Sequence, residues 1–327
     1  MILITGAAGY IGSHTALKFL ENGHEIIIFD NLETGHIETI KTLQKEGSVH
    51  FIKGDLRNQE EINNIFAQYK IDTVLHFAAY AIVEESVKEP EKYYTNNVIG
   101  TLNLLKAMLK YNVKNIIFSS TCATYGEPKY LPIDETHPQN PVNPYGQTKL
   151  TIEKILKDYD RAYNLKSIIL RYFNVAGCDD KIRIGEWHIK ETHLIPNILK
   201  SAVNNTSKFK IYGNDYKTQD GTCIRDYVNV NDLANAHFLA FEYLKKENKS
   251  DIFNLGTEKG QSVKEIFDTC QKVLNKSLNV EIAKKREGDP ARLYADSKKA
   301  KLTLKWNPSH TIEDSIKTAY EWEKKLK

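Results

Sequence analysis

The segment Ile2-Leu-Ile-Thr-Gly-Ala-Ala-Gly-Tyr-Ile-Gly12 joins a short apolar run to three glycines. An apolar run of this length is typical of a buried parallel strand. Residues 13–21 then follow a helical pattern, and Gly23 stands just beyond its expected end. A strand, a glycine loop and a helix in this order direct backbone N–H groups and a helix N-terminus at a diphosphate. The glycine spacing is G-x-x-G-x-x-G, a variant of the commoner G-x-G-x-x-G dinucleotide fingerprint.

An acidic residue, Asp30, closes the next expected strand, residues 25–29. It lies about 20 residues after the glycine loop, where an acidic side chain binds a ribose 2′-hydroxyl. Because a carboxylate at this point repels a 2′-phosphate, the sequence predicts NAD rather than NADP. The alternative is a glycine-rich turn followed by an acidic loop residue. The strand, the helix and Asp30 together favour the nucleotide site.

The composition excludes several classes of protein. The chain has 327 residues, 41% of them hydrophobic, which allows one large domain or two modest ones. Its 45 basic and 42 acidic residues give a net charge of +3 and form no long run of one sign, so neither a nucleic-acid surface nor a membrane surface is expected. No apolar stretch approaches the roughly 18 residues of a membrane span.

Cysteine and histidine patterns bear on the compartment and on metals. The chain begins on an expected strand, so we expect no signal peptide. The four cysteines are far apart and form no C-x-x-C pair, which suits a reduced cytoplasm and indicates neither a zinc site nor a disulfide framework. The ten histidines show no H-E-x-x-H or similar spacing, so no metal is expected.

The first half of the chain alternates expected strands and helices, the order that builds a doubly wound parallel sheet of the α/β class, Rossmann-like. The further strands are expected at 49–52, 73–77, 115–119 and 167–171, and the helices near 34–46, 58–69, 91–111 and 144–163.

Beyond Asn174 the alternation gives way to polar, turn-rich sequence with short strands and helices. We expect a second, smaller mixed α/β domain that binds substrate and is discontinuous in sequence. The predicted NAD-binding domain is 1–175 plus about 226–247, and the predicted substrate domain is about 176–225 plus 248–327. The cleft between them is the expected substrate site.

Tyr145 and Lys149 form a candidate acid–base pair. Asn143 can cap a helix whose first position suits Pro144, so Tyr145 lies in the first turn. Residues four apart share a helix face, and an ammonium beside a phenol, like a positively charged nicotinamide ring, lowers the phenol pKa. A phenol whose pKa moves toward the operating pH can act as a general base. An ordinary aromatic–lysine pair on a helix is the alternative.

Hydroxyl side chains precede this helix in residues 118–126, at the end of an apolar strand. Carboxyl ends of parallel strands meet at the ligand-binding edge of a sheet. A hydroxyl of Ser120 or Thr121 can therefore bond both a substrate oxygen and Tyr145, although a capped turn explains the same residues. With the glycine loop, this segment predicts nicotinamide redox chemistry at an alcohol carbon.

A series of short motifs resembles the extended short-chain dehydrogenase/reductase family and, within it, the UDP-glucose (UDP-galactose) 4-epimerases. The resemblance covers essentially the whole chain. It rests on Gly6-Ala-Ala-Gly-Tyr-Ile-Gly12, Phe29-Asp-Asn-Leu32, Gly54-Asp-Leu56, His76-Phe-Ala-Ala79, Asn96-Asn-Val98, Ser119-Ser-Thr121, Pro144-Tyr-Gly-Gln-Thr-Lys149, Arg171-Tyr-Phe-Asn174, Tyr212-Gly-Asn-Asp-Tyr216, Asp220-Gly-Thr222, Arg225-Asp-Tyr227 and Arg286-Glu-Gly-Asp289.

The resemblance implies a UDP-hexose 4-epimerase that interconverts UDP-glucose and UDP-galactose through a 4-keto intermediate with bound NAD. It implies a catalytic trio of Thr121, Tyr145 and Lys149. The implied cofactor-binding residues are Gly6, Gly9, Tyr10, Ile11, Gly12, Asp30, Asn31, Asp55, Leu56, Phe77, Ala78, Ala79, Asn97, Tyr145, Lys149 and Phe173. The implied substrate-binding residues are Thr121, Asn174, Leu194, Tyr212, Arg225, Arg286, Asp289 and Leu293.

Two departures from the family pattern bear on cofactor retention and sugar range. Ala81 stands where some epimerases have a lysine that contacts the cofactor. Near residue 293, a bulky aromatic side chain in the family excludes N-acetylated sugars. Here Leu293 precedes Tyr294, so a shift of one residue in the alignment reverses the interpretation. With Leu293 at that place, UDP-N-acetylglucosamine is expected to be a substrate as well.

Three other functions are alternatives to the UDP-hexose 4-epimerase. A sugar-nucleotide 4,6-dehydratase needs an added acid–base pair, and related dehydratases have Asp-Glu where this chain has Cys122 and Ala123. Another nucleotide-sugar 4-epimerase, for example of UDP-glucuronate, remains an alternative. A non-catalytic nucleotide-sensing module has no need of the Tyr145 and Lys149 pair.

The family resemblance also implies a homodimer built from helices 91–111 and 144–163. The apolar residues available for such a face, or alternatively for the core beneath the sheet, are Leu102, Leu105, Met108 and Leu109.

Overall fold

A computed structural model describes residues 1–204, 209–285 and 290–327 of the chain. The predicted substrate residues Arg286 and Asp289 lie outside this described part.

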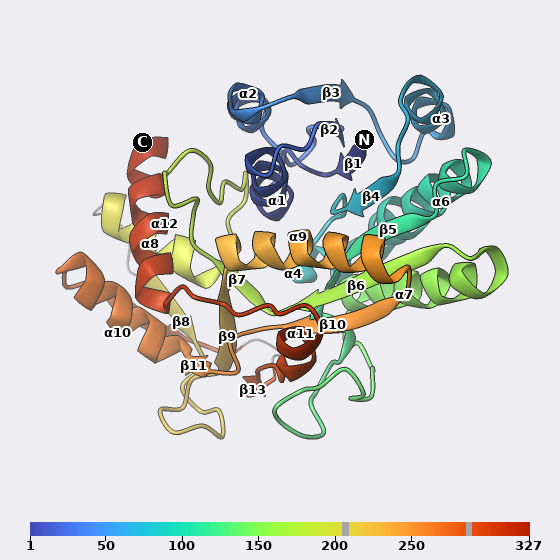
Figure 1. Cartoon of the computed structure of the whole chain (residues 1–327). Helices are drawn as coiled ribbons and strands as arrows, with labels where there is room; N and C mark the ends of the chain where they lie inside the picture. The colour runs from blue at the N-terminus through green and yellow to red at the C-terminus, as the bar shows by residue number, and fades with distance from the viewer. Residues whose placement is uncertain (205–208, 286–289) are drawn as a thin grey trace.

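A seven-stranded parallel sheet forms the centre of the molecule (Figure 1). Every neighbouring pair of strands in it is parallel, which confirms the predicted doubly wound α/β class. From β1 the chain first adds β2 and β3 on one side, and it then adds β4, β5, β6 and β10 on the other side. The direction of winding therefore changes between β1 and β4. Ligands bind at such a switch point in open α/β sheets. In spatial order the strands are β10 (Asp251–Leu255), β6 (Lys166–Tyr172), β5 (Asn115–Thr121), β4 (Thr73–His76), β1 (Ile2–Thr5), β2 (Ile26–Asp30) and β3 (Val49–Lys53).

Helices cover both faces of this sheet, as Figure 1 shows. Successive side chains of a strand point to opposite faces, so Ile2 and Ile4 join one hydrophobic cluster and Leu3 joins another. The first cluster lies under α1 (Tyr10–Glu21), α2 (Ile37–Glu46) and α9 (Val230–Glu247). The second lies under α3 (Gln59–Gln68), α6 (Gly100–Lys110) and α7 (Pro144–Tyr163).

A third hydrophobic cluster forms the core of a smaller mixed α/β region, at the left in Figure 1. Its helices are α8 (Leu194–Asn204), α10 (Val263–Leu274) and α12 (Ile312–Leu326). Two small sheets accompany them, one of β7 (Asn174–Ala176), β9 (Ile224–Asn229), β11 (Gly260–Ser262) and β13 (Arg292–Leu293), the other of β8 (Phe209–Tyr212) and β12 (Val280–Ala283). The short helix α11 (Lys298–Thr303) follows β13 and packs against β10.

The division between the two regions differs from the predicted one at residue 248. Strand β10 pairs with β6 at the edge of the large sheet, so residues 251–255 do not belong to the smaller region. The sequence around β10 reads as an isolated short strand, and its partner lies far earlier in the chain. Its place in the sheet is therefore a tertiary property that the local pattern does not contain.

The helix predicted at 91–111 is divided into three parts: α5 (Pro90–Tyr93), a π-helical segment η1 (Tyr94–Ile99) and α6; a further short helix, α4 (Val83–Lys88), precedes them. Asn97 lies in the wide turn of η1, where its side chain accepts a hydrogen bond from Tyr80 N (2.9 Å) and donates to Tyr80 O (3.0 Å) and Thr148 Oγ1 (3.2 Å). Such π-turns are frequent at functional sites. Among the described residues, no helix is both long and apolar enough to cross a bilayer.

Candidate active site

The glycine loop between β1 and α1 allows three backbone segments to approach closely. Gly6 has φ of +78°, and a Cβ there would lie 2.5 Å from the backbone N of Ala78. A Cβ at Gly12 would lie 2.4 Å from the carbonyl oxygen of Gly6. Thr5 O accepts hydrogen bonds from the backbone N of Phe77 (3.0 Å) and of Ala78 (3.1 Å), which fixes the end of β4 against this loop. Both positions therefore require glycine, because a side chain would prevent these backbone segments from packing so closely.

The N-terminus of α1 fits an anionic group. The helix starts after Gly9, and no side chain caps it. The first N–H groups of a helix have no partner within the helix and carry the positive end of its dipole. In this loop Tyr10, Ile11 and Gly12 provide those groups, so the geometry suits a diphosphate.

Asp30 lies at the end of β2, directly beside the glycine loop. Its Oδ2 accepts a hydrogen bond from Ala8 N (3.0 Å), and its Oδ1 accepts one from Leu32 N (2.8 Å). Burial raises the pKa of this carboxyl, and the two backbone hydrogen bonds oppose that shift. The loop thus holds a carboxylate next to the diphosphate position, where it can accept from a ribose diol and repel a phosphate.

The predicted adenine-side residues gather at the ends of β2 and β3. Asn31 Nδ2 donates to Asp55 Oδ2 (3.0 Å), and Arg57 forms an ion pair of 2.5 Å with the same oxygen. The hydrogen bond from Arg57 lowers the pKa of Asp55 to about 2. Asn103 Nδ2 donates to the carbonyl oxygen of Leu56 (3.0 Å), which fixes the backbone of that residue.

The residues predicted near the nicotinamide lie at the ends of β4 and β6. Phe77, Ala78 and Ala79 follow β4, and the Phe77 ring is 4.8 Å from the ring of His237 on α9. Phe173 follows β6 and is buried. Asn97 differs from them, because its amide is used by Tyr80 and Thr148 and so supports the segment after β4.

The start of α7 places Tyr145 at the carboxyl end of β5. Asn143 caps this helix by accepting from Gly146 N (2.8 Å), with Pro144 at its first position, as the sequence predicts. A Cβ on Gly146 would lie 2.5 Å from the carbonyl oxygen of Ala123, so α7 packs tightly on the short 3₁₀ turn η2 (Cys122–Thr124) that ends β5.

Thr121 rather than Ser120 provides the hydroxyl beside Tyr145. Ser120 Oγ donates to Glu153 Oε1 (2.5 Å), farther along α7. The side chain of Thr121 interacts with that of Tyr145 and favours its phenolate, and Thr121 Oγ1 accepts from Ala123 N (3.2 Å). The two alternatives left by the sequence are thereby reduced to one.

Lys149 is buried beneath Tyr145, 6.0 Å from the centre of its ring, and donates to Ser119 O (2.7 Å). The predicted lowering of the Tyr145 pKa is not seen in this arrangement. Burial raises the pKa of Tyr145 to about 12, and burial also lowers the pKa of Lys149 to about 7. The reason is that removal from water disfavours both charged forms.

A buried polar network that sequence reasoning missed supports this helix. Glu153, one turn beyond Lys149, accepts from Arg171 Nε (2.9 Å) and Arg171 Nη2 (2.5 Å). Arg171 also donates to the Tyr125 hydroxyl (2.9 Å), which in turn donates to Asn254 Oδ1 (2.6 Å). The network joins α7, β6 and β10 behind the Tyr145 and Lys149 pair. The signal in the sequence was an acidic residue on an otherwise apolar face of α7.

Two of the predicted substrate residues lie side by side. Leu293 on β13 pairs in register with Arg225 on β9. Leu293 is buried in one hydrophobic cluster with Cys122 and Phe173, at the ends of β5 and β6. Arg225 Nη1 donates to the carbonyl oxygens of Ile224 and Pro290 (2.8 Å each).

Asn174 begins β7 and pairs with Tyr227 on β9. Leu194 and Tyr212 lie farther off in the smaller region, at the start of α8 and the end of β8. Their substrate roles remain predictions.

The doubly wound sheet, the glycine loop at its switch point and the Tyr145 and Lys149 pair beside Thr121 define a nucleotide-binding enzyme of the short-chain dehydrogenase/reductase class. A family model described as GDP-mannose 4,6 dehydratase matches residues 3–319.

Similarity to individual proteins is more specific. The chain is 51% identical over 324 residues to a UDP-glucose 4-epimerase of Halalkalibacterium halodurans, covering 99% of this chain and 95% of that protein. A structure of UDP-glucose 4-epimerase from Bifidobacterium longum in complex with NAD⁺ and UDP matches with a TM-score of 0.95 and 38% identity, over 99% of this chain and 98% of the other. The UDP-Glc/GlcNAc 4-epimerase of Campylobacter jejuni matches with a TM-score of 0.87 and 43% identity, over 99% of each chain. The chain therefore belongs to the UDP-glucose 4-epimerase family.

Proposed function

We propose that this protein interconverts UDP-glucose and UDP-galactose through a 4-keto sugar, with NAD held in the glycine-loop site. The observation that carries the proposal is the placement of Thr121, Tyr145 and Lys149 at the carboxyl edge of the sheet, beside that loop. NAD, when bound, supplies the hydride acceptor and donor for C4. The protein binds and orients the substrate and moves the proton.

Tyr145 is the group that takes the proton from the sugar 4-hydroxyl and returns it. The Thr121 side chain interacts with that of Tyr145 and can hold the same substrate oxygen in place. When Lys149 is protonated, its ammonium stabilises the Tyr145 phenolate, because a positive charge favours a nearby anion. Thr121 and Lys149 are buried and Tyr145 is partly buried, which limits the access of water to the reacting oxygen.

The residues around the loop favour NAD over NADP. The uncapped start of α1 suits the diphosphate, and Asp30 holds a carboxylate where a 2′-phosphate would lie. Arg225, buried on β9 with a planar guanidinium, is the described residue that we assign to the UDP diphosphate.

The residues at 122 and 123 disfavour dehydratase activity, although the matching family model has a dehydratase description. Elimination of water needs an acid–base pair beside the sugar. Ala123 has no functional group, and burial raises the pKa of Cys122 to about 12. Neither residue can exchange protons with substrate near neutral pH.

The geometry favours a substrate range that includes UDP-N-acetylglucosamine. Leu293 faces Cys122 and Phe173 at the end of β5, whereas the Tyr294 ring lies toward Gly260 on β11, where an added Cβ would be 3.1 Å from it. Neighbouring residues of a strand point to opposite faces. We infer from these contacts that the aromatic side chain points away from the sugar and that the smaller leucine borders it.

We also propose a cytoplasmic homodimer. All four cysteines are free, as expected in a reducing compartment. Leu105 and Met108 are fully buried in the core of the chain, so they are not available for a dimer face. Tyr94 and Ile99, which are 39% and 49% exposed on η1, are better placed for it. Sedimentation at micromolar concentration should give the mass of two chains, and a monomer alone would overturn the dimer.

The proposed activity is tested by two measurements on the purified protein. Denaturation should release NAD close to one equivalent per chain and no comparable amount of NADP. Incubation with UDP-galactose should produce UDP-glucose. Release of NADP instead of NAD would contradict the assignment of Asp30, and a 4-keto-6-deoxy product would identify a dehydratase.

A further inference from the structure

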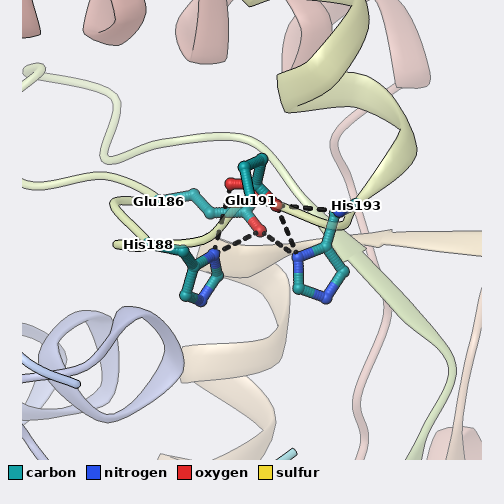
Figure 2. A group of neighbouring side chains, drawn as sticks. All are labelled: Glu186, His188, Glu191 and His193. Atoms are coloured by element: carbon teal, nitrogen blue, oxygen red, sulfur yellow. Dashed lines mark hydrogen bonds and ion pairs between the residues drawn. The ribbon is translucent and has the colours of Figure 1, made fainter. Parts of the chain in front are cut away.

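Four potential metal ligands meet in the connection between β7 and α8. They are Glu186, His188, Glu191 and His193, here called the Glu–His cluster. Figure 2 shows the four side chains pointing toward one another. One ligand atom from each lies within 4.8 Å of the others. The spacing E-x-H-x-x-E-x-H is outside the zinc patterns considered for the sequence, which explains why no metal was expected.

The separations within the Glu–His cluster match a tetrahedral metal site. Zinc binds imidazole nitrogen and carboxylate oxygen at about 2.0–2.2 Å, so neighbouring ligand atoms of a tetrahedron lie about 3.3 Å apart. His188 Nδ1 is 3.3 Å from Glu186 Oε1 and 3.3 Å from Glu191 Oε2. His193 Nδ1 is 2.9 Å from Glu186 Oε1 and 3.0 Å from Glu191 Oε1. A small movement of the half-exposed His193 would complete the tetrahedron.

A second observation, independent of these distances, points to a missing cation. The Glu186 side chain is 5% exposed, and its Oε1 has no hydrogen bond of normal geometry from any described residue. A buried carboxylate oxygen without a proper donor is costly. Two imidazole nitrogens lie close to this oxygen but not along hydrogen-bonding directions, which is the arrangement expected of atoms that share one ion.

The carboxylates are held in place before any ion binds. Glu191 Oε1 accepts from the backbone N of Thr192 and of His193, both at 2.8 Å. The backbone carbonyl of Glu186 accepts from Trp322 Nε1 (3.0 Å). Such supporting contacts orient ligands and strengthen metal binding. The two carboxylates are buried while both histidines are partly exposed, so an ion can enter from the histidine side.

The charges and ligand types specify the class of ion. Two carboxylates and two neutral imidazoles balance one divalent cation, and in its absence two protons on the imidazoles give the same balance. A set of imidazole and carboxylate ligands without sulfur suits first-row divalent ions, and four protein ligands with no open position are typical of structural zinc.

We propose that the Glu–His cluster is a structural binding site for one divalent first-row metal ion, with Zn²⁺ the best match. His193 directly precedes Leu194, the first residue of α8. The His188 ring lies 6.4 Å from the Tyr10 ring at the start of α1. An ion in the cluster therefore fixes the start of α8 against the glycine loop. Because the site is separate from Tyr145, its test does not depend on the proposed activity.

The test uses the full-length protein treated with a chelator and dialysed. Zn²⁺ is titrated by calorimetry, and the Tm is measured with and without the ion. The unaltered protein should bind one Zn²⁺ per chain and gain several degrees in Tm, because a ligand bound only by the folded state stabilises it. His188→Gln and Glu191→Gln should each weaken binding at least about 100-fold and remove most of that gain.

Two further variants separate a metal site from a cluster of ion pairs. His50→Gln removes an exposed histidine that pairs with Glu25 (2.7 Å) outside the cluster, and it should leave Zn²⁺ binding unchanged. His193→Cys removes the imidazole but supplies a thiolate ligand, so it should retain the Zn²⁺-dependent gain in Tm. Lack of saturable Zn²⁺ binding by the unaltered protein, or equal binding by the His188→Gln and Glu191→Gln variants, would overturn the proposal.

Discussion

Leu293 and Arg225 occupy equivalent places on neighbouring parallel strands, so the side chain that borders the proposed sugar position is fixed in register with the guanidinium proposed to bind the diphosphate. Tyr294 directly follows the last residue of β13, and its ring lies toward Gly260 instead. We therefore expect Leu293, and not Tyr294, to limit which sugars the site accepts.

Leu293→Tyr should therefore narrow the substrate range. A tyrosine at this position would fill the space beside the sugar 2-position. We expect kcat/KM for UDP-N-acetylglucosamine to fall at least about tenfold, within the range that one steric contact provides. The value for UDP-glucose should change by no more than a few-fold.

Tyr294→Leu is the matched control for that experiment, because it makes the reverse exchange on the opposite face. It should leave the ratio of the two kcat/KM values unchanged. A ratio that responds to residue 294 and not to residue 293 would show that the aromatic side chain borders the sugar after all.

Gly23 and Gly6 both have a left-handed backbone, but only Gly6 is in close contact with another segment. Comparing alanine substitutions at the two positions separates the cost of backbone strain from the cost of a steric clash. Gly23 has φ of +76° with nothing within 4 Å of an added Cβ, so Gly23→Ala should cost about 1–2 kcal/mol of unfolding free energy. Gly6 has φ of +78°, but its added Cβ would meet Ala78 N at 2.5 Å. Gly6→Ala should cost clearly more in urea unfolding and should reduce the NAD that copurifies. An equal loss of unfolding free energy in the two variants would show that the backbone around Gly6 moves to accommodate the added methyl group.

Glu153→Gln tests the buried network behind α7. Arg171 would keep its charge but lose its ionised partner, and such a loss in a buried pair typically costs about 3–5 kcal/mol. Urea unfolding of the variant measures this cost directly. The double variant Glu153→Leu with Arg171→Met removes both charges and should recover much of the loss. A near-neutral Glu153→Gln would mean that the pair contributes little to folding.

Lys149→Met tests the effect of the buried ammonium on stability. Burial lowers the pKa of Lys149 to about 7, well below its unfolded value of 10.5. Between those values the unfolded chain binds more protons than the native one, so Lys149 makes the free energy of unfolding rise with pH, by at most about 1.4 kcal/mol per pH unit. The nucleotide-free variant should lack this rise. The same slope in both proteins would place the Lys149 pKa near its ordinary value.

Much of the large sheet could be predicted from the sequence, because strands buried on both faces are continuous apolar runs. The runs at 49–52, 115–119 and 167–171 lie within β3, β5 and β6. The helix at 144–163 was predicted with its observed bounds, since Asn143 and Pro144 mark its start.

Features that depend on distant contacts were not predictable in the same way. The helical pattern at 91–111 continues through η1, and only the contacts of Asn97 with Tyr80 and Thr148 show why the turn widens there. The place of β10 in the large sheet depends on its pairing with β6. The effect of burial on the pKa of Tyr145 requires the surroundings of the side chain, which the four-residue spacing to Lys149 does not contain.

The measurement that tests the account most directly is the turnover number of Tyr145→Phe with UDP-galactose. The substitution keeps the aromatic ring and removes only the hydroxyl that is proposed to move the substrate proton. Positioned acid–base groups contribute about 10² to 10⁴ in rate, so kcat should fall by that factor or more, while copurified NAD and thermal stability stay close to those of the unaltered protein. A kcat within tenfold of the unaltered enzyme would remove Tyr145 from the mechanism and contradict the proposed active site.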